Sequence, residues 1–238
     1  NKSDGEHHAM FMKMNADTTP EQFTEKVLNS SNPGEFAALA VSAGGPGSVS
    51  PGQKSTVIMN LEEGPYVLIC EVPGPDGTPH YKMGMITTVQ AKADGTPVTT
   101  APTAETTVDL VDFAFDGLPA NLPSGQHVWE VRNTGKQPPE MIGGLPSRGV
   151  PADAAYQMLT SEAAPPPATP GAAAPAESPA AGPPFVAVAG AAPMDPGNTV
   201  WPVLDLEAGD YVTVCFIPDP ETGKPHIMLG MYAEFTVA

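Results

Sequence analysis

The sequence predicts an all-β protein made of two tandem β-sandwiches, each with one short helix. The 238 residues include 30 prolines and 24 glycines, which makes long helices improbable. Segments rich in β-branched and aromatic residues are short and bounded by glycine and proline, as is typical of strands. They span residues 67–69, 86–89, 108–115, 127–131, 211–216 and 233–237. A long motif also occurs twice, which indicates two units of similar structure.

The repeated motif surrounds the two cysteines. It reads GPYVLICEVPGPDGTPHYKMGM around Cys70 and GDYVTVCFIPDPETGKPHIMLGM around Cys215. Both copies contain G-x-Y-V-x-x-C, a proline, and then G-x-P-H-x-x-x-G-M. The cysteines match at an offset of 145, whereas further upstream Met10 matches Met141 at an offset of 131. The difference between the two offsets indicates an insertion in the second copy.

The repeat divides the chain into a first domain (1–92), a linker (93–105) and a second domain (106–238). Most of the insertion lies in residues 163–184, a segment made almost entirely of Ala, Pro and Gly, which cannot build a core. Residues 20–28 and 151–159 each begin with proline and then space apolar residues helically, so each domain is expected to hold one helix.

The second domain has an opening section, residues 106–131, that reads as two strands and their connection. The alignment pairs Asn1 with Arg132, just after this section, so the first domain lacks its N-terminal strands. Natural proteins normally cover the sheet edge that such a loss exposes. The expected cover is an N-terminal extension, the linker, or a strand from another chain.

Charge excludes two classes of partner. Ten basic and 27 acidic residues give a net charge of −17, which disfavours nucleic acid and anionic lipid. Residues 93–238 carry −13 of this charge and would attract a basic surface. No run of about 18 apolar residues is present, so we expect no transmembrane helix of the chain's own. Two cysteines without CxxC spacing are too few for a disulfide framework.

The Cys, His and Met loops resemble those of the cupredoxins, the β-sandwich family that holds a type 1 copper. In that family a late strand ends in Cys, the next loop supplies His and then Met, and another His comes earlier, after a turn containing glycine. The ending H-x-x-x-G-M is similar to plastocyanin, and the longer gap between Cys and His is similar to copper nitrite reductases. The resemblance implies Greek-key sandwiches and a site of one thiolate, two imidazoles and a weak thioether, which suits copper redox cycling.

The resemblance assigns candidate ligands residue by residue. In the first domain the set is complete: His8, Cys70, His80 and Met85. In the second domain it is degenerate: Cys215, His226 and Met231. The early His position there is Pro139, which cannot bind a metal. The alternative is that both cysteines are ordinary buried core residues.

The run HHAMFMKM at residues 7–14 has two interpretations. Its thioethers and imidazoles suit a copper(I) carrier. Alternatively, Met10, Met12 and Met14 alternate along a strand and face a sandwich core, which we favour.

Two functions follow from the sequence. The first is a non-enzymatic interaction or scaffold subunit, periplasmic or extracellular, docked on a protein assembly such as a respiratory or photosynthetic membrane complex. The alternative is a type 1 copper one-electron carrier that uses the first domain. The degenerate ligands, missing strands and insertion favour the first, with residues 163–184 contacting the partner. Ile69 and Val214 precede the cysteines where nitrite reductases have the His for their catalytic second copper. This argues against reductase activity, and no enzyme is expected.

Overall fold

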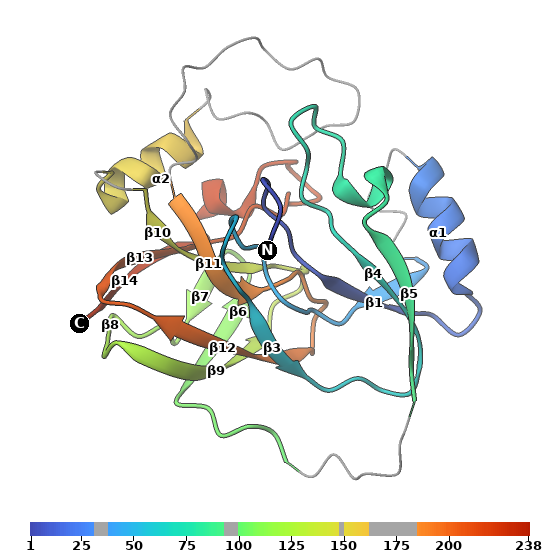
Figure 1. Cartoon of the computed structure of the whole chain (residues 1–238), viewed down its shortest axis with the longest axis horizontal. Coiled ribbons are helices and arrows are strands. Elements are labelled where there is room, and N and C mark those ends of the chain that lie inside the picture. Colours follow the sequence, from blue (N-terminus) through green and yellow to red (C-terminus); the bar gives the residue numbers. More distant parts are fainter. Residues whose placement is uncertain (31–37, 93–99, 148–149, 162–184) are drawn as a thin grey trace.

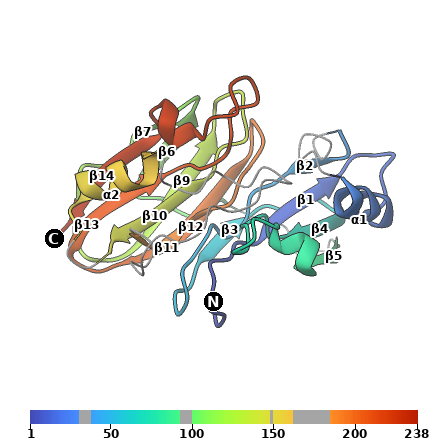
Figure 2. The same cartoon turned by 90° about the horizontal axis from the view of Figure 1, so that it is seen from above.

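The computed structural model describes residues 1–30, 38–92, 100–147, 150–161 and 185–238. Within these residues the strands form three sheets, which lie in two neighbouring groups (Figures 1 and 2). The first sheet has the order β2-β1-β4-β5. Its strands are β1 (Met10–Met14), β2 (Ala40–Ser42), β4 (Gly64–Ile69) and β5 (Ile86–Ala91).

The other two sheets form a β-sandwich. One has the order β11-β10-β13-β14-β8, with β8 (Asn121–Leu122), β10 (Met141–Pro146), β11 (Phe185–Ala191), β13 (Gly209–Val214) and β14 (Tyr232–Val237). The other has the order β3-β12-β9-β6-β7, with β3 (Thr56–Met59), β6 (Thr106–Val111), β7 (Ala114–Asp116), β9 (Gly125–Asn133) and β12 (Thr199–Leu206). Their inner faces share one core, where Trp129 of β9 meets Phe235 of β14 with ring centres 5.7 Å apart.

One helix accompanies each half, as predicted. Helix α1 (Pro20–Asn29) begins with a capping box between Thr19 and Gln22 and buries Phe23 and Val27 completely. These two side chains share a core cluster with the inward methionines of β1, which alternate with more exposed neighbours. Met10, Met12 and Met14 therefore lie on one buried face of a strand, as predicted, but this face packs against α1 and not in a sandwich core. Helix α2 (Ala152–Thr160) lies beside the sandwich and buries Ala155 (Figure 2).

The opening section of the second half contains more strands than the sequence predicts. Residues 108–115 were expected to be one strand, but they belong to β6 and β7, which pair as an antiparallel hairpin. Phe113 adopts a positive φ of 66° at the turn between them. Sequence patterns miss this turn because it contains neither glycine nor proline. Residues 106–131 thus include β6, β7, β8 and most of β9.

The register of the repeat differs by one residue from the sequence alignment. Met10 of β1 pairs with Ile69, and Ile142 of β10 pairs with Val214. Ile69 and Val214 each precede the motif cysteine, so Met10 corresponds to Ile142 rather than to Met141. The offset is 132, and Asn1 corresponds to Asn133 rather than to Arg132. Adjacent apolar residues at 141 and 142 made both alignments acceptable, although a shift by one residue reverses every side chain in a strand.

Backbone pairing joins the two halves of the chain. Strand β3 of the first half pairs with β12 of the second. The Ser42 N–H donates to Asp195 Oδ2 at 2.8 Å, and the Ala187 N–H donates to Ser50 Oγ at 3.0 Å. At the offset of 145 these two bonds are equivalent, so an approximate two-fold axis relates the halves. The domain division at 1–92, 93–105 and 106–238 stays a prediction.

Two further expectations concern membranes and the insertion. In the described part of the chain, no helix has the length and apolar character needed to cross a bilayer. The Ala/Pro-rich segment 163–184, which we expected to contact a partner, lies outside the described residues.

Ser50→Ala tests the pairing between the halves. The buried Ser50 hydroxyl accepts the Ala187 N–H, and alanine would leave this fully buried donor without a partner. We expect the free energy of unfolding to fall by about 1–3 kcal/mol in urea denaturation. The exposed Ser124→Ala is the matched control and should change it by less than about 0.5 kcal/mol. Equal effects of the two substitutions would show that this contact does not stabilise the protein.

Candidate metal centre

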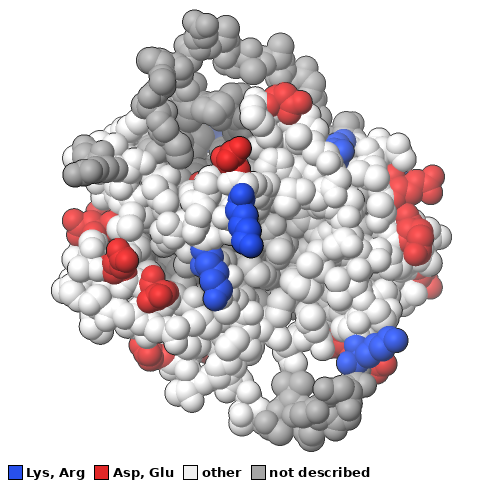
Figure 3. Space-filling view, viewed as in Figure 1, with Lys and Arg blue, Asp and Glu red and all other residues white. Residues whose placement is uncertain are grey.

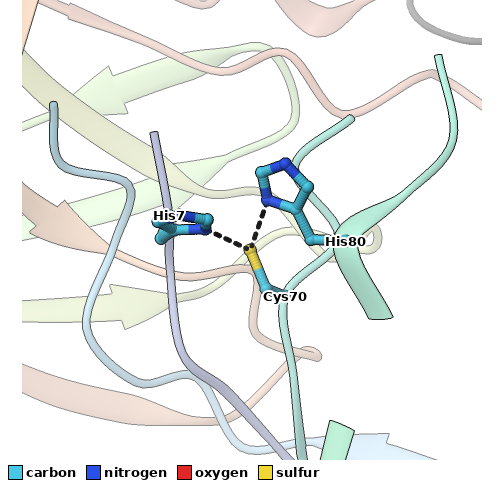
Figure 4. Close-up of side chains that lie close together, drawn as sticks. All are labelled: His7, Cys70 and His80. Atoms are coloured by element: carbon cyan, nitrogen blue, oxygen red, sulfur yellow. Dashed lines mark hydrogen bonds between the residues drawn. The ribbon is translucent and has the colours of Figure 1, made fainter. Parts of the chain in front are cut away.

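Three side chains from separate parts of the first half converge on one point (Figure 4). The Cys70 Sγ lies 3.8 Å from His7 Nδ1 and 3.6 Å from His80 Nδ1. All three ligand atoms lie within 4.8 Å of one another. His7 precedes β1, Cys70 directly follows β4, and His80 begins the short 3-10 helix η2 (His80–Met83). Both rings point at the sulfur in Figure 4.

The backbone of His7 is held from both sides. Its N–H donates to the Val49 carbonyl at 3.3 Å, and its carbonyl accepts the Val49 N–H at 3.0 Å. Two residues later the Ala9 N–H donates to the Pro46 carbonyl at 3.0 Å. The segment that precedes β1 is therefore paired before it reaches the strand, and the His7 ring is oriented by secondary structure.

The loop after β4 is folded back onto Cys70. The Tyr81 N–H donates to the Cys70 carbonyl at 2.8 Å, and the Cys70 N–H donates to the Met85 carbonyl at 3.2 Å. Gly84 closes η2 with a φ of 106°, a conformation that favours glycine, and so returns the chain to Cys70. These bonds place the Met85 backbone beside Cys70. The Met85 side chain is 40% exposed.

The spacing of the three atoms fits a copper ion. A thiolate at about 2.2 Å and an imidazole at about 2.0 Å from one ion, 120° apart, lie about 3.6 Å from each other. The observed separations of 3.6 and 3.8 Å are close to this value. One sulfur and two nitrogens also match the donor set of blue-copper sites. The side chains of this cluster thus fit the group that the resemblance implies.

The structure brings His7, not His8, to the cysteine. Successive side chains of an extended segment point to opposite sides, so only one of the two can face Cys70. The His8 Nε2 instead accepts the N–H of Glu71 at 2.8 Å, and the side chain is almost fully buried. Its Nδ1 has no partner among the described residues. Burial, reinforced by the charges of His80 and His7, lowers the pKa of His8 to about 4.

Alternation selects His7 once the register of β1 against β4 is known. Met10 faces the helix side of the sheet, and His8 has the same parity as Met10. Ile69 pairs with Met10, so the two side chains lie on the same face of the sheet. Cys70 follows Ile69, so its side chain lies on the opposite face, which is also the face of His7. Comparison with the family's turn, counted from Gly5, selected His8 because this comparison does not consider the register of β1.

The protonation states of His7 and Cys70 act on metal binding in opposite directions. Burial and then the charge of His80 lower the pKa of His7, which keeps the ring neutral at pH 7. Burial raises the pKa of the Cys70 thiol, although hydrogen bonds to it act in the opposite direction. The thiol therefore holds its proton when no metal is present. Metal binding must release that proton, so affinity should rise with pH.

The second half repeats the frame of this site with fewer ligands. Cys215 Sγ lies 3.4 Å from His226 Nδ1, and the Cys215 N–H donates to the Met231 carbonyl at 3.3 Å. His226 begins the 3-10 helix η3 (His226–Leu229), and its Nε2 lies 2.8 Å from Gln137 Oε1. At the offset of 132, Pro139 occupies the position of His7. The structure thus keeps Cys, His and a buried Met together and replaces the other imidazole by proline.

Glu140 takes the place of His8 in the second half. Its Oε1 accepts the N–H of Phe216, the residue after Cys215, at 3.0 Å, as His8 accepts that of Glu71. The Glu140 N–H also lies 3.5 Å from Cys215 Sγ. Burial raises the pKa of Glu140 to about 7, although the Phe216 N–H opposes the shift. Sequence patterns did not single out this residue because glutamate has no counterpart in the copper motif.

Glu140→Gln tests the cost of this buried carboxyl. Because burial raises its pKa from 4.5 to about 7, the folded protein retains a proton that the unfolded chain releases over this pH range. The associated stability is full below about pH 4.5 and is lost as pH rises through 7. Glutamine stays neutral and can still accept the Phe216 N–H. We expect the variant to be more stable than the natural protein by about 1–3 kcal/mol at pH 8 and to show no gain at pH 4.5, measured by urea denaturation.

The exposed Glu221→Gln is the matched control for charge alone and should leave stability nearly unchanged at both pH values. A Glu140→Gln protein that is no more stable than the natural one at pH 8 would contradict the assignment.

No protein-family model and no curated protein matches the chain. Among solved structures, it is similar to dithionite-reduced auracyanin from the photosynthetic bacterium Roseiflexus castenholzii, with 21% identity, coverage of 57% of this chain and 99% of that chain, and a TM-score of 0.35. It is also similar to auracyanin A, a "blue" copper protein of Chloroflexus aurantiacus, with 17% identity, coverage of 56% and 96%, and a TM-score of 0.34. A multicopper oxidase matches 99% of this chain and 71% of its own length at 13% identity, with a TM-score of 0.29. At these TM-scores the matches carry no argument about this chain. Its fold is given by its own strand order, and its Cys, His and Met loops resemble those of the cupredoxins.

Proposed function

We propose that the protein is a one-electron carrier in which His7, Cys70 and His80 would hold one copper ion, with the Met85 thioether as a weak fourth donor. The observation that carries this proposal is the convergence of the Cys70 sulfur and the two Nδ1 atoms at separations of 3.6 and 3.8 Å. When bound, copper supplies one-electron redox chemistry between two oxidation states. The interaction-subunit function, which the sequence favours, stays a prediction.

The fixed backbone supports electron transfer at low reorganisation. His7 is held by its two bonds to Val49, and Cys70 by the bonds to Tyr81 and Met85. Side chains that are already in place need to move little when the charge of the bound group changes. His7 and His80 are only half-buried, so their ring edges give a short route between the sulfur and the surface. The chain thus provides both a rigid ligand frame and access for an electron.

The partner and location follow from charge and from the resemblance. Figure 3, oriented as Figure 1, shows acidic side chains along the left and right margins and near the top, and basic ones in the middle and on the right. With a net charge of −17, association with a basic protein surface is electrostatically favoured. The proposal includes an extracytoplasmic location and an electron-transfer complex of a membrane as the partner, as the cupredoxin resemblance implies.

Cys70→Ser tests the copper site. Removal of the thiolate should abolish the intense visible absorption of the copper(II)-loaded protein and lower copper affinity by more than about 100-fold. Cys215→Ser is the matched control, because Cys215 has the same position in the second half and lacks the second imidazole. Its absorption should match that of the natural protein. Equal copper binding by both variants, measured by elemental analysis and absorption titration, would exclude a site at Cys70.

Neighbouring histidines separate the two candidate ligand sets. We expect His7→Ala to lose the intense band, since its Nδ1 lies 3.8 Å from the sulfur. His8→Ala should keep the band and instead lower the free energy of unfolding by about 1–3 kcal/mol, because the Glu71 N–H loses its acceptor. Absorption of the copper-loaded variants and urea denaturation measure the two effects. If His8→Ala alone loses the band, His8 is the ligand, as the sequence motif suggested.

A further inference from the structure

Asn1 has the same hydrogen bonds as Asn133, the last residue of β9. The Asn1 N donates to the Gln53 carbonyl at 2.7 Å, as the Asn133 N–H donates to the Asn198 carbonyl at 3.0 Å. The Gly52 N–H donates to the Asn1 carbonyl, as the Gly197 N–H donates to the Asn133 carbonyl. The Asn1 Nδ2 donates to the Gly5 and Val49 carbonyls, as the Asn133 Nδ2 donates to the Gln137 and Met194 carbonyls. The Ser3 N–H donates to Asn1 Oδ1, as the Gly135 N–H donates to Asn133 Oδ1. Asn1 therefore occupies the end of a strand equivalent to β9.

Strand β3 offers an edge on which such a strand would lie. In the second half β12 pairs with β9 on one side and with β3 on the other. Strand β3 corresponds to β12 at the offset of 145, and the pair Val57–Pro202 joins two equivalent residues. Among the described residues, β3 pairs with β12 alone and forms the edge of its sheet. The edge of β3 that faces away from β12 thus corresponds to the edge of β12 that pairs with β9.

The first sheet exposes a face that the second half buries. Val89 of β5 pairs with Tyr66, as Phe235 of β14 pairs with Tyr211. Val89 is 36% exposed, whereas Phe235 is 4% exposed because β9 and its neighbours cover it. Val41, on the same face of the first sheet as Lys13 and Tyr66, is 40% exposed. Tyr66 on the same face is only 1% exposed, and Lys13 there pairs with Glu62, so the exposed apolar part of this face is the part that holds Val41 and Val89.

We infer that this face and the free edge of β3 bind a β-sheet segment of the same polypeptide that runs directly into Asn1. The segment would resemble Thr106–Asn133 in form, with a last strand along β3 and apolar side chains facing Val89. A segment joined to Asn1 is favoured over a separate chain because β9 enters Asn133 without a break, and Asn1 has all the bonds of that position. The inference is independent of the copper proposal.

A graft of the chain's own strands tests the inference. Residues 104–132 are placed directly before Asn1, so that Arg132 precedes Asn1 as it precedes Asn133. We expect amide hydrogen exchange at Val57–Met59 and at Val89 to slow by at least about tenfold relative to the chain without the graft. The control graft carries Val108→Asp and Trp129→Asp in the added copy, which removes its apolar inner face, and it should give no protection. The segment 104–132 is also added to the chain as a separate peptide, which keeps the test valid if the graft misfolds.

Three results would overturn the inference. In the first, neither the graft nor the peptide slows exchange on β3. In the second, the control graft protects as well as the apolar one, which would show that the face does not select its occupant. In the third, the chain without the graft sediments as a dimer with these amides already protected, which would make a second copy the occupant.

Discussion

The alternation of side chains along the segment that enters β1 determines both the core and the candidate metal centre of the first half. Because of this alternation, the side chains of Met10, Met12 and Met14 point toward α1, where they pack with Phe23 and Val27. The same alternation places His7 on the opposite side, within 3.8 Å of the Cys70 sulfur. Neither arrangement could change without the other, because a shift by one residue would expose the methionines and withdraw the imidazole.

The two halves show that the frame of the site does not require the complete ligand set. In each half the N–H of the motif cysteine donates to a methionine carbonyl, that of Met85 or of Met231. A glycine with left-handed backbone conformation closes the short 3-10 helix in both halves. Only the early imidazole differs, with Pro139 in the position of His7. Because backbone bonds and burial hold the loops, a ligand can be lost while the loop geometry remains. The loop geometry alone therefore does not indicate metal binding, which depends on the donor side chains that the loops carry.

The sequence predicted the all-β class, both helices and most central strands, because these depend on local patterns of apolar residues and on Pro and Gly. It located Cys70 and His80 through the motif. It assigned His8 instead of His7, because the choice depends on strand register, which one alignment at two apolar neighbours could not determine. It also missed the pairing of β3 with β12. Pairing between distant strands leaves no periodic signal, and β3 is a short strand whose partner belongs to the other half of the chain.

The second half supports the candidate metal centre of the first through this pairing. The Gly47 N–H donates to the Gly190 carbonyl at 3.2 Å. Two residues later, the N–H and carbonyl of Val49 both bond to the backbone of His7. A Cβ on Gly47 would lie 2.7 Å from the Gly190 carbonyl carbon, so the close approach of the two backbones requires glycine there. Ala192 of the second half is buried in the methionine cluster of the first. The half with the degenerate ligand set thus fixes the strand that orients His7, which gives it a structural role in the candidate site of the first half.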